Sequence, residues 1–243
     1  MSHLHVPDGV LPVWLWSLGL LLTFLLLGLA LRSLRKRDLR HKLPLLAFTS
    51  ALMLVGMSLH LVPLAYHLNL SVLAGILLGP CLGFVASFLV NFMLALVGHG
   101  GLTTVGLNTL ILGWETFCGY WFFSIFRRWL RPPIAAGAAV LLALFLSTSL
   151  VIGLVAATRL DVSQFGKTTE KAHLHGPASP PMEKGNGHRE GEDSHGHPLS
   201  LPTFALGAYL LGSIGWIVEA LVVALVVAFL QQVKPEMISV PKG

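Results

Sequence analysis

The sequence predicts an all-α integral membrane protein, built as a bundle of seven helices. Two observations lead to this fold class. First, 54% of the 243 residues are hydrophobic and only 11% are charged, whereas an average soluble domain is about 25% charged. Second, ten of the charged residues fall between Asp161 and Asp193, so the rest of the chain consists of long uncharged segments joined by short loops. This composition excludes a disordered, a collagen-like or a disulfide-rich chain and argues against a soluble enzyme.

Six segments are long enough to cross a membrane, which takes roughly 20 apolar residues in a helix. They are uncharged, or interrupted by a single glutamate: 12–31, 43–66, 68–98, 103–126, 133–158 and 202–233. The interruptions are Glu115 in the fourth segment and Glu219 in the last. The third segment is longer than one helix requires, and Gly79-Pro80 lies inside it, where proline disrupts helical hydrogen bonding.

The basic residues decide between one helix and two in the third segment. They form two clusters, which mark cytoplasmic loops: Arg32, Arg35, Lys36, Arg37, Arg40 and Lys42, and then Arg127, Arg128 and Arg131. Only a break at Gly79-Pro80 places both clusters on the same side. We therefore expect seven helices, an external N-terminus and a cytoplasmic C-terminus. The broken pair must be sheltered by other helices, because lipid cannot satisfy exposed backbone groups.

The polar segment 159–201 is then external, and it is too poor in apolar residues to order itself. It contains five histidines: His173, His175, His188, His195 and His197. Two interpretations remain open, a tract that gathers metal ions and an inert linker. The two cysteines, Cys81 and Cys118, lie in apolar segments and are expected to be packing residues. The basic residues lie in short loops, so we expect contact with membrane lipid and none with nucleic acid.

The first residues carry metal-binding chemistry. Met1-Ser2-His3 offers a terminal amine, backbone amides and an imidazole, and loss of Met1 would leave the shorter amine-X-His spacing. Planar nitrogen coordination of this kind selects Ni(II) or Cu(II). His5 follows, just before a turn at 6–9 that proline and Asp-Gly favour. The alternative interpretation is a frayed terminus with two idle histidines.

Other ionisable residues lie in or near the apolar segments, where they are functional candidates by default. We expect His60 to form a hydrogen bond inside the bundle, and His67, at the end of the second helix, to turn toward a central cavity. His99 is either a site residue or a solvated loop residue. Glu115 and Glu219 either relay protons or fix helix packing through hydrogen bonds.

Several motifs together point to one family. They are His5-Val6-Pro7-Asp8-Gly9, His67 followed by residues 74–80, the stretch 99–108 that begins His-Gly-Gly-Leu-Thr, Glu219-Ala220-Leu221, and Lys234-Pro235-Glu236. With these motifs, which span nearly all of the chain except the His-rich loop, the sequence resembles the CbiM/NikM family. Its members are the substrate-capture components of energy-coupling-factor (ECF) transporters for nickel or cobalt.

The resemblance implies seven helices with an external N-terminal segment folded back into the bundle. It also implies a metal site made of the terminal amine, the amide and imidazole of a first histidine, and a second imidazole from the core. By motif these histidines are His5 and His67. The chain then divides into a metal-binding segment (1–11), helices one to six (12–158), the external, disordered loop (159–201), and the last helix with a cytoplasmic tail (202–243).

This chain departs from the family pattern because three residues precede Leu4-His5. Three arrangements remain open. His3 takes the terminal role with the amine of Ser2 or Met1, or the chain is trimmed to begin at Leu4, or His3 and His5 both bind. Trp114-Glu115 is a second departure and leaves the role of its helix open.

The sequence contains no Gly-x4-Gly-Lys-Ser/Thr phosphate loop, so we do not expect an enzyme that hydrolyses ATP. The resemblance implies the partners that would: two ATPase subunits, a transmembrane coupling protein and a small accessory membrane component, all at a bacterial cell membrane. Ni²⁺ or Co²⁺ would be the transported substrate and not a cofactor, and cobalt uptake would feed cobalamin biosynthesis. The planar nitrogen set leans to nickel, but cobalt-specific members share these motifs.

Three functions of other kinds remain as alternatives. The first is a stand-alone metal permease driven by protons through the two glutamates. The second is a membrane metalloenzyme, which the lack of His-Glu-x-x-His and Gly-x-Ser-x-Gly motifs disfavours. The third is a purely structural membrane subunit.

Overall fold

The fold is all-α, as predicted. The computed structural model describes residues 13–35, 39–40, 42–58, 67–98, 101–158 and 201–234. Within these ranges the chain forms seven helices: α1 (Val13–Leu34), α2 (Leu43–Ser58), α3 (Ser71–Leu78), α4 (Pro80–Leu96), α5 (Val105–Phe126), α6 (Pro132–Thr158) and α8 (Leu201–Val233). Four of the predicted segments match α1, α5, α6 and α8 to within three residues at each end.

Three helices are long and apolar enough to cross a membrane by length and composition: α1, residues 132–154 of α6, and residues 205–233 of α8. Many of their large apolar side chains are exposed in the isolated chain, as at Leu21 in α1 and Leu206 in α8. In water such a surface would drive aggregation, whereas acyl chains solvate it. The pattern is that of an integral membrane protein.

The predicted break at Gly79-Pro80 is confirmed. Gly79 separates α3 from α4 with φ 82° and ψ 173°, a conformation that favours glycine, and Pro80 is the first residue of α4. The expectation of two spanning helices here is only half right, because the eight residues of α3 extend about 12 Å, less than the ~30 Å of hydrocarbon. All eight residues of α3 are buried, which confirms that other helices shelter it.

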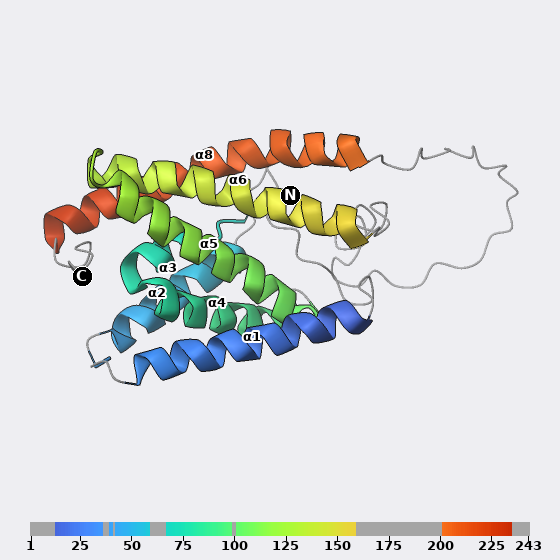
Figure 1. The fold of residues 1–243 in the computed structure, drawn as a ribbon. Helices are drawn as coiled ribbons and strands as arrows, with labels where there is room; N and C mark the ends of the chain where they lie inside the picture. Colours follow the sequence, from blue (N-terminus) through green and yellow to red (C-terminus); the bar gives the residue numbers. More distant parts are fainter. Residues whose placement is uncertain are drawn as a thin grey trace, which may run out of the picture.

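The helix ends gather at two faces of the bundle (Figure 1). The starts of α1, α5 and α8 lie at the right of the view with the end of α6, and the ends of α1, α5 and α8 lie at the left with the start of α6. The loop after α1 and the loop after α5 are therefore at the same end. Since these loops carry the two basic clusters, the arrangement is the one that the two-helix interpretation of 68–98 required.

Helix α5 lies at the centre and packs against α1, α3, α4 and α6, while α8 runs along α6. Glycines allow two close backbone contacts of α5 with its neighbours. A Cβ on Gly75 of α3 would lie 2.3 Å from the Thr116 carbonyl oxygen, and a Cβ on Gly106 would lie 2.5 Å from the Leu20 backbone nitrogen. Small residues at helix interfaces let backbones approach in this way. The result is that α3 is fixed against the middle of α5.

Candidate metal site

His67 is the one predicted ligand that the structure places. It lies in the non-helical segment 67–70 between α2 and α3 and is half-buried. The structure describes α2 to Ser58 and shows no helical structure at residues 67–70, and the prediction that His67 ends the second helix depends on residues 59–66, which lie outside the described residues. The segment enters the protein interior within two residues, since Asn69 and Leu70 are both buried.

Leu70 gives this segment its shape. Its backbone is left-handed, with φ 57° and ψ 15°, and it is the one non-glycine residue with a positive φ among those that the structure describes. A left-handed conformation costs an L-residue about 1–2 kcal/mol. Leu70 also stands at the N-cap of α3 without forming a side-chain hydrogen bond there. The turn must therefore be stabilised by other groups.

Glu219 of α8 supplies the first of these groups. Its Oε1 accepts the Leu70 backbone N–H at 3.0 Å, and its Oε2 accepts the Asn69 backbone N–H at 3.4 Å. The carboxylate thus holds the backbone of the turn that leads into α3, where a negative charge is also favourable. Glu219 itself is fully buried.

Glu115 of α5 binds the same segment from a different helix. Its Oε2 accepts a hydrogen bond from the Asn69 side-chain Nδ2 and one from Ser71 Oγ at 2.7 Å. Ser147 of α6 also hydrogen-bonds to this carboxyl group. Glu115 is fully buried as well. The contacts of the two glutamates favour the packing alternative that the sequence left open for them.

The other predicted ligands lie outside the described residues. This holds for Met1, Ser2, His3 and His5, and also for His60, His99 and the histidines of 159–201. The proposed N-terminal metal-binding segment and the external His-rich loop therefore stay predictions. Within the ranges that are described, no three His, Cys, Asp or Glu side chains gather at a spacing that would hold a metal ion.

Sequence analysis missed Asn69, Leu70 and Ser71 as parts of this site. The only signal for them was that Asn69 and Ser71 are polar residues in an apolar segment, immediately after a candidate histidine. The alanine and glycine residues of α2 differ in their burial. Ala47 and Ala51 are exposed, whereas Gly56 is buried, and a Cβ there would lie 2.7 Å from the Leu68 carbonyl oxygen. Gly56 thus serves the packing of the His67 segment.

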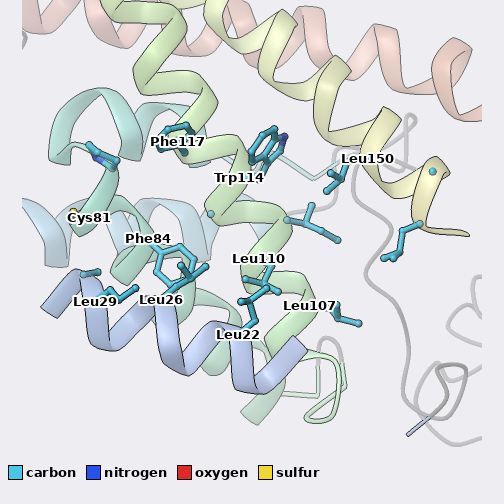
Figure 2. A pocket seen from close by; sticks show the side chains of 16 residues that line it. Leu22, Leu26, Leu29, Cys81, Phe84, Leu107, Leu110, Trp114, Phe117 and Leu150 are labelled. Carbon is cyan, nitrogen blue, oxygen red and sulfur yellow. The ribbon is translucent and has the colours of Figure 1, made fainter. Parts of the chain in front are cut away.

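A large apolar cavity is lined by α1, α4, α5 and α6 (Figure 2). It measures about 990 Å³ and is lined almost entirely by apolar side chains of α1, α4, α5 and α6, among them Leu26, Phe84, Leu110 and Leu150. Cys81 lies on its wall, and Cys118 is buried in the core; both are free thiols, consistent with packing roles. The lining offers no set of ligands for a metal ion, so the cavity is no candidate for the metal site.

Fold and sequence together define an all-α membrane protein in which a histidine-bearing turn is held inside a helical bundle. The family model described as "Cobalt uptake substrate-specific transmembrane region", CbiM, matches residues 5–237. The chain belongs to this family. The match extends from His5 almost to the C-terminus and includes His67, Glu115 and Glu219.

Individual relatives agree with this assignment. The cobalt transport protein CbiM of Thermosynechococcus vestitus is 29% identical over 150 residues, which cover 56% of this chain and 56% of that protein. The chain thus aligns with little more than half the length of this relative. The crystal structure of a transition metal transporter superposes with a TM-score of 0.69 at 22% identity, covering 96% of this chain and 94% of that one. A truncated transition metal transporter gives a TM-score of 0.68 at 20% identity. These structures share the fold.

Proposed function

We propose that this protein is the membrane component that captures Ni²⁺ or Co²⁺ for an ECF-type ABC importer. The observation that carries the proposal is the family match over residues 5–237, which includes both predicted histidine ligands. The position of His67 supports it further, because His67 precedes a buried turn held by two carboxylates.

The proposed ligands are nitrogen atoms from two parts of the chain, the helical bundle and the N-terminal segment. His67 provides an imidazole from the bundle, and His5 provides an imidazole and an amide from the N-terminal segment. His3, Met1 and Ser2 are the candidates for completing the set with the terminal amine. Imidazole suits Ni(II) and Co(II) alike, and a planar four-nitrogen set favours Ni(II). Since the imidazoles must be neutral to bind, capture weakens as the medium becomes acidic.

The energy for import would come from partner subunits. The chain lacks a phosphate-binding loop for ATP, and the proposed partners are a transmembrane coupling protein, two ATPase subunits and a small accessory membrane component. Ala47 and Ala51 of α2, exposed four residues apart on one helix, offer small side chains for contact with such a membrane partner.

Uptake assays in cells that lack other nickel and cobalt importers test this proposal. We expect cells with this chain and all partners to accumulate labelled Ni²⁺ or Co²⁺, and cells with an ATPase subunit inactivated at its phosphate-loop lysine to remain at the empty-vector level. Comparison of the two labels identifies the substrate. Equal uptake with and without the ATPases, abolished by a protonophore, would contradict the proposal and identify a proton-driven permease.

The proposed orientation places both basic loops in the cytoplasm. Trp129 and Leu102 are exposed residues beyond opposite ends of α5, which is about 33 Å long. In a background where Cys81 and Cys118 are replaced by alanine, we expect a membrane-impermeant maleimide added to intact cells to label Leu102→Cys and not Trp129→Cys. Labelling after cell lysis controls for reactivity. The reverse labelling pattern would show the opposite orientation.

A further inference from the structure

Two buried carboxylates from helices far apart in the sequence converge on residues 69–71. Glu219 is 149 residues from Leu70, and Glu115 is 44 residues from Ser71. Burying a carboxylate is costly unless its oxygens are well hydrogen-bonded. An N-cap side chain accepts the N–H groups of the second or third helical residue, whereas Glu219 accepts those of Asn69 and Leu70, which precede α3. Glu219 therefore holds the turn that leads into α3 and does not cap the helix itself.

The strained backbone lies at the centre of this arrangement. Leu70 is left-handed and its N–H is bound by Glu219 Oε1, while Asn69 is bound through its backbone by Glu219 and through its side chain by Glu115. Strained backbone persists only where the surroundings over-determine it, and it is concentrated at functional sites. Here the over-determined residues begin two positions after His67.

The short link to His67 gives this geometry a consequence. Two peptide units separate the Cα atoms of His67 and Asn69 by at most about 7.6 Å, so the direction in which the chain leaves Asn69 limits where His67 can place its imidazole. Metal sites tolerate errors in ligand distance of only about 0.2 Å. A histidine on an unsupported coil would lose affinity to conformational freedom, as poorly supported ligands do.

We propose that Glu115 and Glu219 are positioning residues of the metal site: they hold residues 69–71 in the turn that fixes the place of the His67 imidazole. This inference rests on the proposed function, because it assumes that His67 binds the transported ion. Glu219 acts on the backbone of the turn, and Glu115 acts on the Asn69 and Ser71 side chains.

The test begins with the metal-free, full-length protein in detergent. Hydrogen exchange of the peptide that contains Leu70 is measured in wild type, Glu219→Gln and Glu219→Ala. We expect faster exchange at Asn69 and Leu70 in Glu219→Ala, and an intermediate rate in Glu219→Gln, whose remaining carbonyl oxygen still accepts one N–H. Exchange elsewhere in α8 should stay as in wild type.

The second measurement is the affinity of the same proteins for Ni²⁺ and Co²⁺ by calorimetry. We expect Glu219→Gln and Glu115→Gln to bind about tenfold more weakly than wild type, and Glu219→Ala to bind more weakly still but by less than about a hundredfold, within the range found when groups that orient metal ligands are removed. If Glu219→Ala does not fold, the affinity of Glu219→Gln alone decides the test.

Thr23→Val is the matched control. Thr23 is a fully buried polar residue whose Oγ donates to the Gly106 carbonyl oxygen at 2.8 Å, a bond between α1 and α5 that does not involve residues 67–71. Its loss should lower the melting temperature without changing Leu70 exchange or metal affinity. A role of the glutamates in general stability alone would give the same result for them as for this control.

The outcomes separate the two proposals. If wild type binds neither ion, or if His67→Ala binds as wild type does, the proposed site fails and this inference fails with it. If wild type binds, His67→Ala binds much more weakly, and the Glu219 variants keep wild-type affinity or wild-type exchange at Leu70, the inference alone is wrong.

Discussion

Replacing Gly75 by alanine is expected to prevent the bundle from closing around α3. The added Cβ would lie 2.3 Å from the Thr116 carbonyl oxygen and 3.1 Å from its carbon. These are backbone atoms of the central helix α5, so no side-chain rotation relieves the clash. Overpacking of a rigid core costs typically 1–3 kcal/mol and occasionally more, and we expect a loss of about 3 kcal/mol or more here. In detergent the variant should show a lower melting temperature and aggregation on size-exclusion chromatography.

Gly28→Ala is the control for the same change of residue in a helix. No heavy atom lies within 4 Å of a Cβ built on Gly28, so the substitution adds a methyl group to open space in α1. We expect its free energy of unfolding to stay within about 0.5 kcal/mol of wild type. A Gly75→Ala protein as stable as Gly28→Ala would mean that α3 and α5 do not approach as closely as this structure has them.

Local features of the sequence predicted most of the fold. The Gly79-Pro80 break could be predicted because proline and a glycine with positive φ act within a few residues. The two basic clusters then decided the number of helices, since both must lie on the same side of the membrane. The limit of this reasoning appears at α3, whose eight residues were expected to span. Apolar composition measures burial, and it does not distinguish burial in lipid from burial in protein.

The site was less predictable, for a physical reason. The turn at Leu70 depends on a carboxylate that is 149 residues away in the sequence, and no periodicity or local motif connects them. Glu115 and Glu219 could be identified as unusual residues in apolar helices, but the N–H and O–H groups that justify their burial belong to another part of the chain. A carboxylate in an apolar segment indicates that hydrogen-bond donors surround it, but only the fold shows which donors these are.

His67→Ala is expected to have the largest effect on metal capture. Structural metal sites with four protein ligands gain about 10–16 kcal/mol on binding, or about 3 kcal/mol for each ligand. Loss of one imidazole should therefore weaken Ni²⁺ or Co²⁺ binding by about two orders of magnitude, and loss of His5 should do the same. Titration of the purified protein followed by measurement of bound metal checks this. Thr23→Val, whose lost hydrogen bond to the Gly106 carbonyl oxygen does not involve residues 67–71, serves as the control, and wild-type affinity is expected for it.

Deleting residues 1–3 decides which amine completes the site. If the mature chain uses Leu4 as its terminus, the deletion variant places a free amine one residue before His5 and should bind at least as tightly as wild type. If His3 takes the terminal role, the deletion removes an imidazole together with the native amine, and affinity should fall by at least the hundredfold expected for His67→Ala. The two results differ in sign, so one calorimetric comparison distinguishes a trimmed terminus from a terminus that includes His3, provided that His67→Ala abolishes tight binding in both backgrounds.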